Sequence, residues 1–400
     1  MINKINLIGT MLTGCFFKFR YRKCSYPRKN IIIYFPQQIG DVILFLATLN
    51  KISKKYSDNY NLYFLARQSV ISFLKDNMDF DSKVNLIEID VERIKYDCKY
   101  VNTLSLNYMT QIDKFIVPNY SMTGLLFALR LSCEKVCMIS DLSYNSSWFI
   151  RFIYCNVFNN VVFVSQDMME LVRYKFLLQA LNIVPDLIKM PTIMAKNRHS
   201  NISLIKSRYC VVSIGASLPE KIWPMKRFSE IIFYITTKKI DVYVCGNKAE
   251  VNLQKKLEQY INGNNNHIKL CVGQTSMNEW VDLIQNAEFV IGNDSASIHI
   301  AAACKIPSIC LCGSYDKNQF FPYVVEEEST VLPIVIRKNM PCEYCRAKGN
   351  YFGYGNKKCQ KYIRENTSSL CMAKISVTDV ICEIDNLLKS FCVPQKRLNF

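Results

Sequence analysis

Residues 288–313 constrain the fold more than any other stretch of this chain, because they read as strand, turn, helix and strand. An apolar strand over 289–291 runs into a turn over 292–295 that carries a capping oxygen, and apolar residues then recur at helical spacing. Such a turn presents unpaired N–H groups and the positive end of a helix dipole. Asp294 and His299 fall where open α/β sheets place polar chemistry. The segment therefore predicts a site for a phosphorylated ligand.

Strand-like and helix-like segments alternate over most of the chain, which predicts an α/β fold. Half of the 400 residues are hydrophobic, enough to fill the cores of two or three domains. A polar, basic segment at 196–206 reads as a linker, and the alternation restarts after it. We therefore expect two doubly wound, Rossmann-like domains facing a central cleft, at 31–195 and 207–390. Strands are predicted at 31–35, 62–66, 84–89, 114–117, 160–164, 209–214, 241–245, 269–272, 289–291 and 308–312, and helices at 42–51, 226–237, 250–260 and 277–285.

The net charge of +17 calls for an anionic neighbour: nucleic acid, a membrane or a glycolipid. No nucleic-acid module accompanies the charge and the basic residues are scattered, so we expect no nucleic-acid partner. The first thirty residues hold seven Lys or Arg and no acid, beside an apolar patch at 8–17. This composition favours a basic amphipathic tail on a membrane surface over a signal peptide or a disordered tail. Because no apolar run approaches the roughly 20 residues that span a bilayer, we expect a cytoplasmic, peripheral membrane protein.

Eighteen cysteines without a secretory cleavage pattern indicate a reducing compartment rather than a disulfide framework. Four of them gather in a loop at 341–371: Cys342, Cys345, Cys359 and Cys371. A Cys-x-x-Cys hook with two further cysteines can form a tetrahedral thiolate site for structural zinc or iron. Free thiols in a substrate loop are the alternative.

Each predicted domain opens with a short loop directly after a strand. In the first, Gly40 allows close approach to a ligand and Asp41 puts a carboxylate at the sheet rim, where it could also merely cap a helix. In the second, Gly215 and Ser217 suit a loop that approaches phosphate, and Lys221 adds a positive charge.

The order of these motifs resembles glycosyltransferase family 9, the heptosyltransferases, from about residue 31 to residue 388. The resemblance implies the two-domain GT-B fold and an inverting transfer of a sugar, plausibly heptose, from a nucleotide diphosphate to lipopolysaccharide core, O-antigen or a related anionic glycan or glycolipid. ADP-heptose is the favoured donor, and no catalytic metal is expected. Asp41 matches the general base and Lys221 the lysine on the donor diphosphate. The implied donor-binding residues are Gly215, Ser217, Glu250 (at the ribose), Asp294 (at the sugar), Ser295, Ala296 and His299.

Two positions depart from the family pattern: Ala296 stands where most members have glycine, and Ala47 where proline is favoured. The methyl group of Ala296 could narrow the choice of sugar. Arg67, Arg130, Arg151 and Lys175 are candidates for binding an acidic acceptor in the first domain. The alternatives are a non-catalytic, glycan-binding relative and an NAD(P)-dependent oxidoreductase. The chain lacks a Gly-x-Gly-x-x-Gly turn after either opening strand, which counts against the oxidoreductase.

Overall fold

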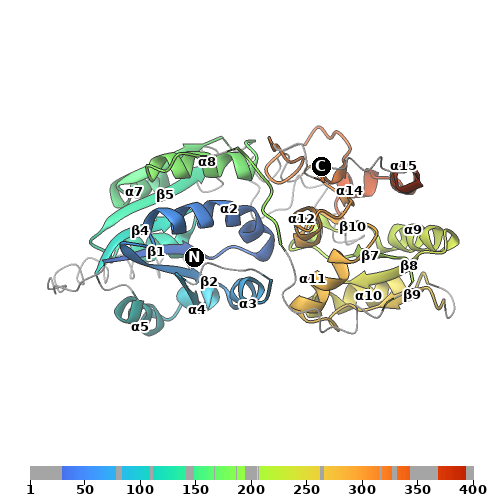
Figure 1. Ribbon diagram of the computed structural model, residues 1–400, viewed down its shortest axis with the longest axis horizontal. Coiled ribbons are helices and arrows are strands. Elements are labelled where there is room, and N and C mark those ends of the chain that lie inside the picture. Colours follow the sequence, from blue (N-terminus) through green and yellow to red (C-terminus); the bar gives the residue numbers. More distant parts are fainter. Residues whose placement is uncertain are drawn as a thin grey trace, which may run out of the picture. The chain divides into compact units, whose positions relative to one another are not determined.

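The computed structural model describes residues 29–77, 83–108, 111–140, 148–165, 167–185, 187–193, 205, 207–261, 265–314, 318–326, 331–342 and 368–392. The chain divides into two compact units, Met1–Lys189 and Met190–Phe400 (Figure 1). Each contains one six-stranded sheet in which every pairing is parallel. This confirms the predicted α/β class of doubly wound units.

The first unit has the strand order β3-β2-β1-β4-β5-β6. Strands that are successive in the chain are added on one side of β1 up to β3, and on its other side from β4 onward, so the order reverses between β1 and β4. Its elements are β1 (Lys29–Phe35), α2 (Ile39–Tyr56), β2 (Tyr60–Ala66), α3 (Gln68–Asn77), β3 (Val84–Glu88), α4 (Val91–Ile94), α5 (Cys98–Tyr108), β4 (Ile112–Val117), α6 (Met122–Ala128), β5 (Glu134–Ser140), α7 (Trp148–Val157), β6 (Asn160–Val164) and α8 (Glu170–Ala180).

β1 is the central strand of this sheet and is buried on both faces, as its continuous apolar run predicts. Ile32 and Tyr34 belong to a core shared with helices α4 to α7. On the other face, Phe35 stacks on Phe45 of α2, with ring centroids 5.0 Å apart. Both layers hold β1 in place, so the residues that follow it start from a fixed point.

The second unit has the order β12-β11-β10-β7-β8-β9, with its reversal between β7 and β10. Its elements are β7 (Tyr209–Ser213), the 3₁₀ helix η2 (Pro219–Lys221), α9 (Met225–Thr237), β8 (Asp241–Cys245), the 3₁₀ helix η3 (Lys248–Glu250), α10 (Val251–Glu258), β9 (Ile268–Leu270), α11 (Met277–Gln285), β10 (Val290–Asn293), α12 (Ala296–Ala303), β11 (Ser308–Leu311), β12 (Ile334–Ile336), α14 (Leu370–Lys374) and α15 (Val377–Cys392).

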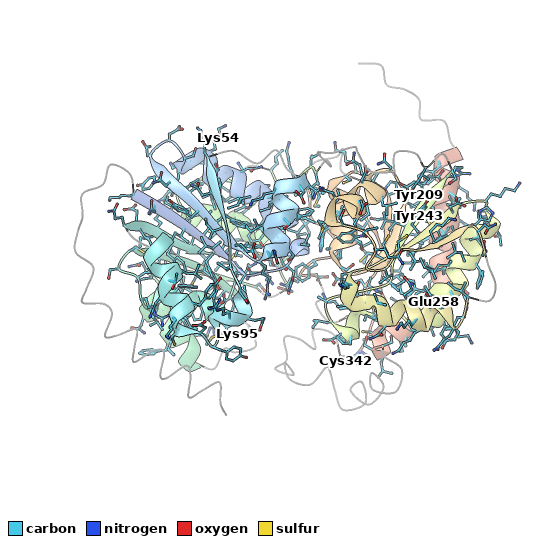
Figure 2. All side chains as sticks on the ribbon, turned by 90° about the horizontal axis from the view of Figure 1, so that it is seen from below. Lys54, Lys95, Tyr209, Tyr243, Glu258 and Cys342 are labelled. Atoms are coloured by element: carbon cyan, nitrogen blue, oxygen red, sulfur yellow. The ribbon has the colours of Figure 1, made fainter. Side chains whose placement is uncertain are left out.

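Trp223 connects the segment between α14 and α15 to the rest of this second unit. Its side chain is fully buried, packs edge-on against Phe228 of α9 and donates an Nε1–H hydrogen bond to the carbonyl of Ile375 (3.0 Å). At the opposite end of the unit, the backbone N–H of Ile193 bonds to the carbonyl of Ala303 at the end of α12. Across the sheet, Tyr209 of β7 and Tyr243 of β8 lie edge to face with ring centroids 5.0 Å apart (Figure 2).

The two reversals of strand order locate the edges that matter for binding. In open α/β sheets, ligands bind beyond the carboxyl ends of the strands where the order reverses. In the first unit these are the segments after β1 and β4, and in the second the segments after β7 and β10. Within the described ranges, no helix is both long and apolar enough to cross a bilayer.

Candidate functional site

A buried ion pair lies at the carboxyl edge of the second sheet. Asp294 comes directly after β10 and Lys221 ends η2, in the segment after β7, and the Lys221 Nζ lies 3.0 Å from the Asp294 carboxylate. Each side chain is 8% exposed. Desolvation makes a buried pair a poor source of stability, so such a pair is better explained by function. Two residues that lie 73 positions apart in the sequence are thus brought together.

Asn293 fixes the loop that carries Lys221. Its Oδ1 accepts the backbone N–H of Trp223 (3.0 Å), and its Nδ2 donates to the carbonyls of Ile214 (3.0 Å) and Gly215 (3.1 Å). Asn293 has no exposed surface, so each bond is made in a dry environment where an unpaired group is costly. Sequence reasoning treated Asn293 only as a turn residue. The signal it missed is an amide, which can donate and accept at once, placed directly before the aspartate at a strand end.

The N-terminus of α12 lies at the same carboxyl edge of the sheet, directly after β10 and Asp294. Ser295 occupies the N-cap position with extended backbone angles but makes no side-chain capping bond, and its Oγ lies 3.0 Å from the Oγ of Ser297. The expected capping oxygen is therefore directed elsewhere. The Ile298 N–H bonds to the Ser295 carbonyl (3.2 Å), and the helix dipole favours an anion near the N–H groups of residues 296 and 297. Ala296, the first residue of α12, is half-buried.

Glu250 lies against two glycines, Gly215 and Gly246, that follow strands β7 and β8. A Cβ atom at Gly215 would overlap the Glu250 carboxyl group, and one at Gly246 would lie 2.7 Å from its Oε2. Glu250 accepts the backbone N–H of Asn247 (2.7 Å), which orients the carboxylate, while burial raises its pKa above the ordinary value. Close packing, rather than an unusual backbone angle, is thus what requires glycine at 215. Ser217, further along this loop, is exposed.

His299, in the first turns of α12, is enclosed by aromatic rings from the segment after β11. It is 3% exposed and stacks on Phe321 with ring centroids 4.8 Å apart. Its Nδ1 forms a hydrogen bond with the hydroxyl of Tyr323 (2.5 Å). Burial lowers the pKa of His299 to about 4, so the ring is neutral near pH 7. Phe320 of the same segment lies 5.2 Å from the Lys221 Nζ. None of these three aromatic residues stands out in the sequence as part of a site.

In the first unit, Asp41 lies at the carboxyl end of β1, as predicted, and also caps a helix. It is the third residue of α2, and its carboxylate accepts the backbone N–H of Gln38 (3.1 Å) within a capping box. Gly40 is an ordinary helical residue of α2 and takes no left-handed angle, so the expected glycine turn is wrong. The start of α2 three residues earlier than predicted explains the difference.

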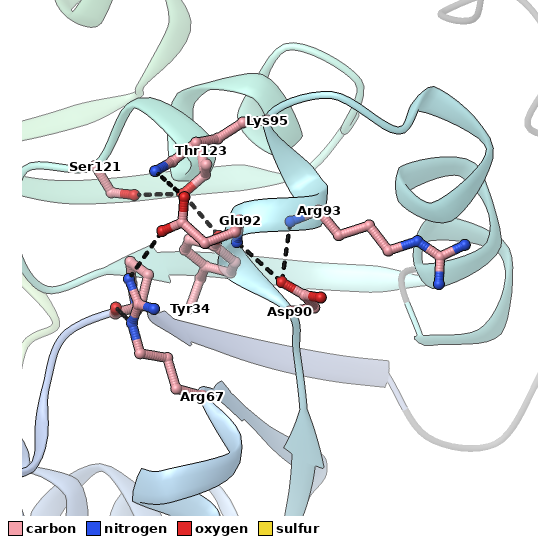
Figure 3. A network of polar contacts seen from close by, with 9 residues as sticks. Tyr34, Arg67, Asp90, Glu92, Arg93, Lys95, Ser121 and Thr123 are labelled. Carbon is pink, nitrogen blue, oxygen red and sulfur yellow. Dashed lines mark hydrogen bonds and ion pairs between the residues drawn. The ribbon is translucent and has the colours of Figure 1, made fainter. Parts of the chain in front are cut away.

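A polar network links the strand ends around this edge (Figure 3). Arg67, directly after β2, donates through Nε to the carbonyl of Pro36 (2.7 Å) and lies 3.8 Å from Glu92 of α4. Beside it, Tyr34 donates its hydroxyl hydrogen to Thr123 (2.8 Å) at the start of α6. The network puts the cation of Arg67 beside the segment after β1, where the strand order reverses.

The two other candidate acceptor-binding arginines lie in different surroundings, one of them buried and one half-buried at the surface. Arg130 is buried beyond α6, and Arg151 lies over the ring of Phe163 (5.3 Å). Near Asp41, the hydroxyl of Tyr174 accepts a hydrogen bond from Asn119 (3.2 Å). Burial, together with the charges of Glu170 and Asp41, holds the pKa of Tyr174 well above its usual range.

The predicted thiolate cluster falls largely outside the described residues, which include neither Cys345 nor Cys359. Cys342 is half-buried (Figure 2), and Cys371 is buried in the core with its Sγ 3.1 Å from the Ser369 hydroxyl. Within the described ranges, no group of three or more His, Cys, Asp or Glu side chains is arranged to hold a metal ion.

The chain is similar to known sugar transferases. Residues 164–351 match the model of glycosyltransferase family 9 (heptosyltransferase). Over 120 residues, 29% of this chain, it is 28% identical to lipooligosaccharide heptosyltransferase 2 of Haemophilus influenzae. The matched segment spans 34%, about a third, of that relative's length.

Solved structures show the same fold. A glycosyltransferase of family 9 from Veillonella parvula has a TM-score of 0.68 at 16% identity, covering 93% of this chain and 100% of that one. The ADP-heptose lipopolysaccharide heptosyltransferase II of E. coli has a TM-score of 0.64 at 16% identity, covering 90% and 99%. The iron-containing dodecameric glycosyltransferase TibC of E. coli has a TM-score of 0.55 at 12% identity, covering 92% and 79%. Residues 164–351, a little under half of the chain, are thus similar to glycosyltransferase family 9 (heptosyltransferase), and the chain has the GT-B fold of the solved structures.

Proposed function

We propose that this protein is an inverting glycosyltransferase that moves a sugar from a nucleoside diphosphate to a hydroxyl of an anionic bacterial glycan. The observation that carries the proposal is the buried Lys221–Asp294 pair beside the uncapped start of α12. Sugar transfer leaves negative charge on the departing diphosphate, and a fixed cation with a helix N-terminus can stabilise it without water reorganising. In this reading Lys221 and the N–H groups of α12 hold the diphosphate, and Asp294 holds the sugar.

Glu250 is the proposed ribose ligand. A carboxylate accepts hydrogen bonds from a pair of hydroxyl groups, and the Asn247 N–H already orients this one. Its contact with Gly215 puts it beside the proposed phosphate loop, with Ser217 further along that loop. ADP-heptose is the favoured donor, because the E. coli relative with the same fold is described as an ADP-heptose enzyme.

Asp41 is the proposed general base. Single displacement at the anomeric carbon needs one base to take the proton of the incoming hydroxyl, and it inverts the configuration. The Gln38 N–H holds the Asp41 carboxylate at the sheet edge, and Arg67 supplies positive charge at the same edge for a phosphorylated or acidic acceptor. The acceptor proposed is lipopolysaccharide core, O-antigen or a related glycolipid.

A nucleotide panel tests the donor site. Thermal shifts with ADP, GDP, UDP, CMP, NAD and NADP are measured on the wild type, on Lys221→Ala and on Lys226→Ala, an exposed lysine of the same unit. One nucleoside diphosphate should raise the melting temperature of the wild type and the control by mass action, but not that of Lys221→Ala. Stabilisation by NAD or NADP alone would overturn the transferase reading. If the protein binds a nucleoside diphosphate but releases none from the corresponding nucleotide sugar in the presence of acceptor, it is a non-catalytic relative.

We also propose that Cys342, Cys345, Cys359 and Cys371 hold a structural iron or zinc ion. Four thiolates form a suitable ligand set for either metal, and a relative with this fold is described as iron-containing. The protein as purified is analysed for bound metal, with Cys342→Ser against the exposed-thiol control Cys382→Ser. Loss of metal in Cys342→Ser alone supports the site, whereas an equal metal content in all three proteins overturns it.

A peripheral position on the cytoplasmic membrane face is proposed for the basic tail at 1–30, most of which lies outside the described residues. Vesicles containing an anionic phospholipid should sediment the full chain, and a chain lacking residues 1–28 should stay in the supernatant. Equal binding to zwitterionic vesicles would count against the charge-based attachment.

A further inference from the structure

The aromatic segment after β11 encloses a histidine of the proposed donor site. Phe320, Phe321 and Tyr323 all lie near His299, with ring centroids 4.8 to 6.1 Å from the imidazole. Tyr323 is the only one of the three that can make a conventional side-chain hydrogen bond, and its hydroxyl reaches Nδ1 of His299. The contact raises the question of which group carries the shared hydrogen.

Burial decides the direction of this bond. Tyr323 is 7% exposed, and in the described part of the chain its hydroxyl has His299 as its one hydrogen-bond partner. If Nδ1 were protonated and donated, the phenolic hydrogen would have no acceptor, which costs about 1–3 kcal/mol in a buried site. If the phenol donates, every polar hydrogen of the contact is used. Burial also raises the pKa of Tyr323 well above its ordinary value, so the phenol keeps its hydrogen.

We infer that Tyr323 donates its hydrogen to Nδ1 of His299 and fixes the neutral tautomer protonated at Nε2, which then donates to the diphosphate of the nucleotide sugar. Tyr323 is a positioning residue, because it acts through His299. The ligand part rests on the proposed function; the tautomer does not. Lys221 and Asp294, the charged pair of the site, both act electrostatically on the ring. A neutral donor adds a hydrogen bond to the diphosphate without a second buried cation beside Lys221.

The tautomer can be observed directly, because the chain has three histidines, His199, His267 and His299. Full-length protein labelled with ¹⁵N-histidine is studied by long-range ¹H–¹⁵N spectra, with the His299→Gln variant assigning the signals. The wild type should show His299 neutral and protonated at Nε2 near pH 7. Tyr323→Phe, which keeps the ring and removes the hydroxyl, should show a mixture of tautomers or a protonated Nδ1. A wild-type His299 protonated at Nδ1 would overturn the inference.

A double-mutant cycle tests whether the effect of Tyr323 runs through His299. ADP affinity is measured for the wild type, Tyr323→Phe, His299→Ala and the double variant, with Tyr260→Phe as a remote, exposed control. With His299 present, Tyr323→Phe should weaken ADP binding several-fold, which corresponds to the loss of about one hydrogen bond. In the His299→Ala background, Tyr323→Phe should not change ADP affinity further. Equal weakening in both backgrounds would mean that Tyr323 only supports the fold.

The NMR experiment and the ADP-binding measurements together distinguish a failure of the tautomer assignment from a failure of the proposed function. A wild type with the predicted tautomer that binds no nucleoside diphosphate would overturn the ligand role and the proposed function, while leaving the Tyr323–His299 contact supported. A wild type that binds ADP but has the opposite tautomer would overturn the positioning role alone.

Discussion

At the scale of single residues, the candidate site contains a buried ion pair that contributes little to the stability of the fold. Lys221 and Asp294 are ionised groups held 3.0 Å apart with almost no exposed surface. Their attraction must offset a desolvation cost of several kcal/mol per ion. Apolar side chains of similar volume would fill the same space without that cost, so the pair is a poor source of folding stability.

That argument predicts opposite outcomes for single and double replacement. Lys221→Met should lower the free energy of unfolding by about 3–5 kcal/mol, because Asp294 is left buried and unpaired. Lys221→Met with Asp294→Leu should restore stability to within about 1 kcal/mol of the wild type, yet bind no nucleoside diphosphate. Urea unfolding and ADP binding measure the two properties separately. A double variant as unstable as the single one would show that the pair has a structural role.

His299 makes the stability of the fold depend on pH. Its pKa is about 4 in the folded protein, against 6.5 for an ordinary histidine. Because the folded state resists protonation, this contribution is complete above pH 6.5 and is lost as the pH falls from 6.5 towards 4, by at most about 3 kcal/mol. His299→Gln should flatten the wild-type slope of unfolding free energy against pH in this window. Parallel slopes in the wild type and His299→Gln would refute the assignment.

At the scale of elements, the sequence predicted the regular structure well where the pattern was dense. The strand at 160–164 and the helix at 277–285 begin and end at the predicted residues. Strands β5 and β12 were not predicted. β5 begins with two charged residues, Glu134 and Lys135, and β12 has only three residues. Both pair with the strands next to them in chain order, and that pairing, rather than a local pattern, makes them strands.

The candidate site shows the same division. Asp294, Lys221 and Glu250 stand out as charges in loops after strands, which a sequence reveals. The hydrogen bonds of Asn293 and the rings around His299 depend on segments that meet only when the sheet forms. The loop containing Phe320, Phe321 and Tyr323 reads in the sequence as ordinary apolar residues. A sequence can thus predict the charged groups of such a site better than the neutral ones that orient them.

Gly215 is where an element depends on one missing side chain. Gly215→Ala would push its methyl group into the Glu250 carboxyl group and displace it, at a cost of about 1–3 kcal/mol. We expect lower stability and weaker ADP binding than in the wild type. Adding Glu250→Ala should remove the clash, so the double variant should regain the lost stability while still binding ADP weakly. If Gly215→Ala destabilises equally with and without Glu250, the contact does not explain the glycine.

At the scale of the whole molecule, the two units repeat one plan with different chemistry. Each has a parallel sheet whose strand order reverses once, and each places its conspicuous polar residues beyond that reversal. The edge of the second unit combines a buried cation with a helix N-terminus, which suits a diphosphate. The edge of the first unit combines a carboxylate with an arginine, which suits activating a hydroxyl on an anionic molecule. We therefore propose that donor binding and proton removal belong to different halves of the chain.

This assignment predicts that the two activities can be separated by one substitution. Asp41→Asn keeps the shape of the side chain and can still accept the Gln38 N–H, so α2 should remain capped. ADP affinity should stay within about twofold of the wild type, while turnover with donor and acceptor should fall by about 10²–10⁴-fold for want of a base. Asp58→Asn, at an exposed aspartate of the same unit, should change neither. Because the proposed donor residues all belong to the second unit, a loss of ADP affinity in Asp41→Asn would contradict the division, and undiminished turnover would remove Asp41 as the base.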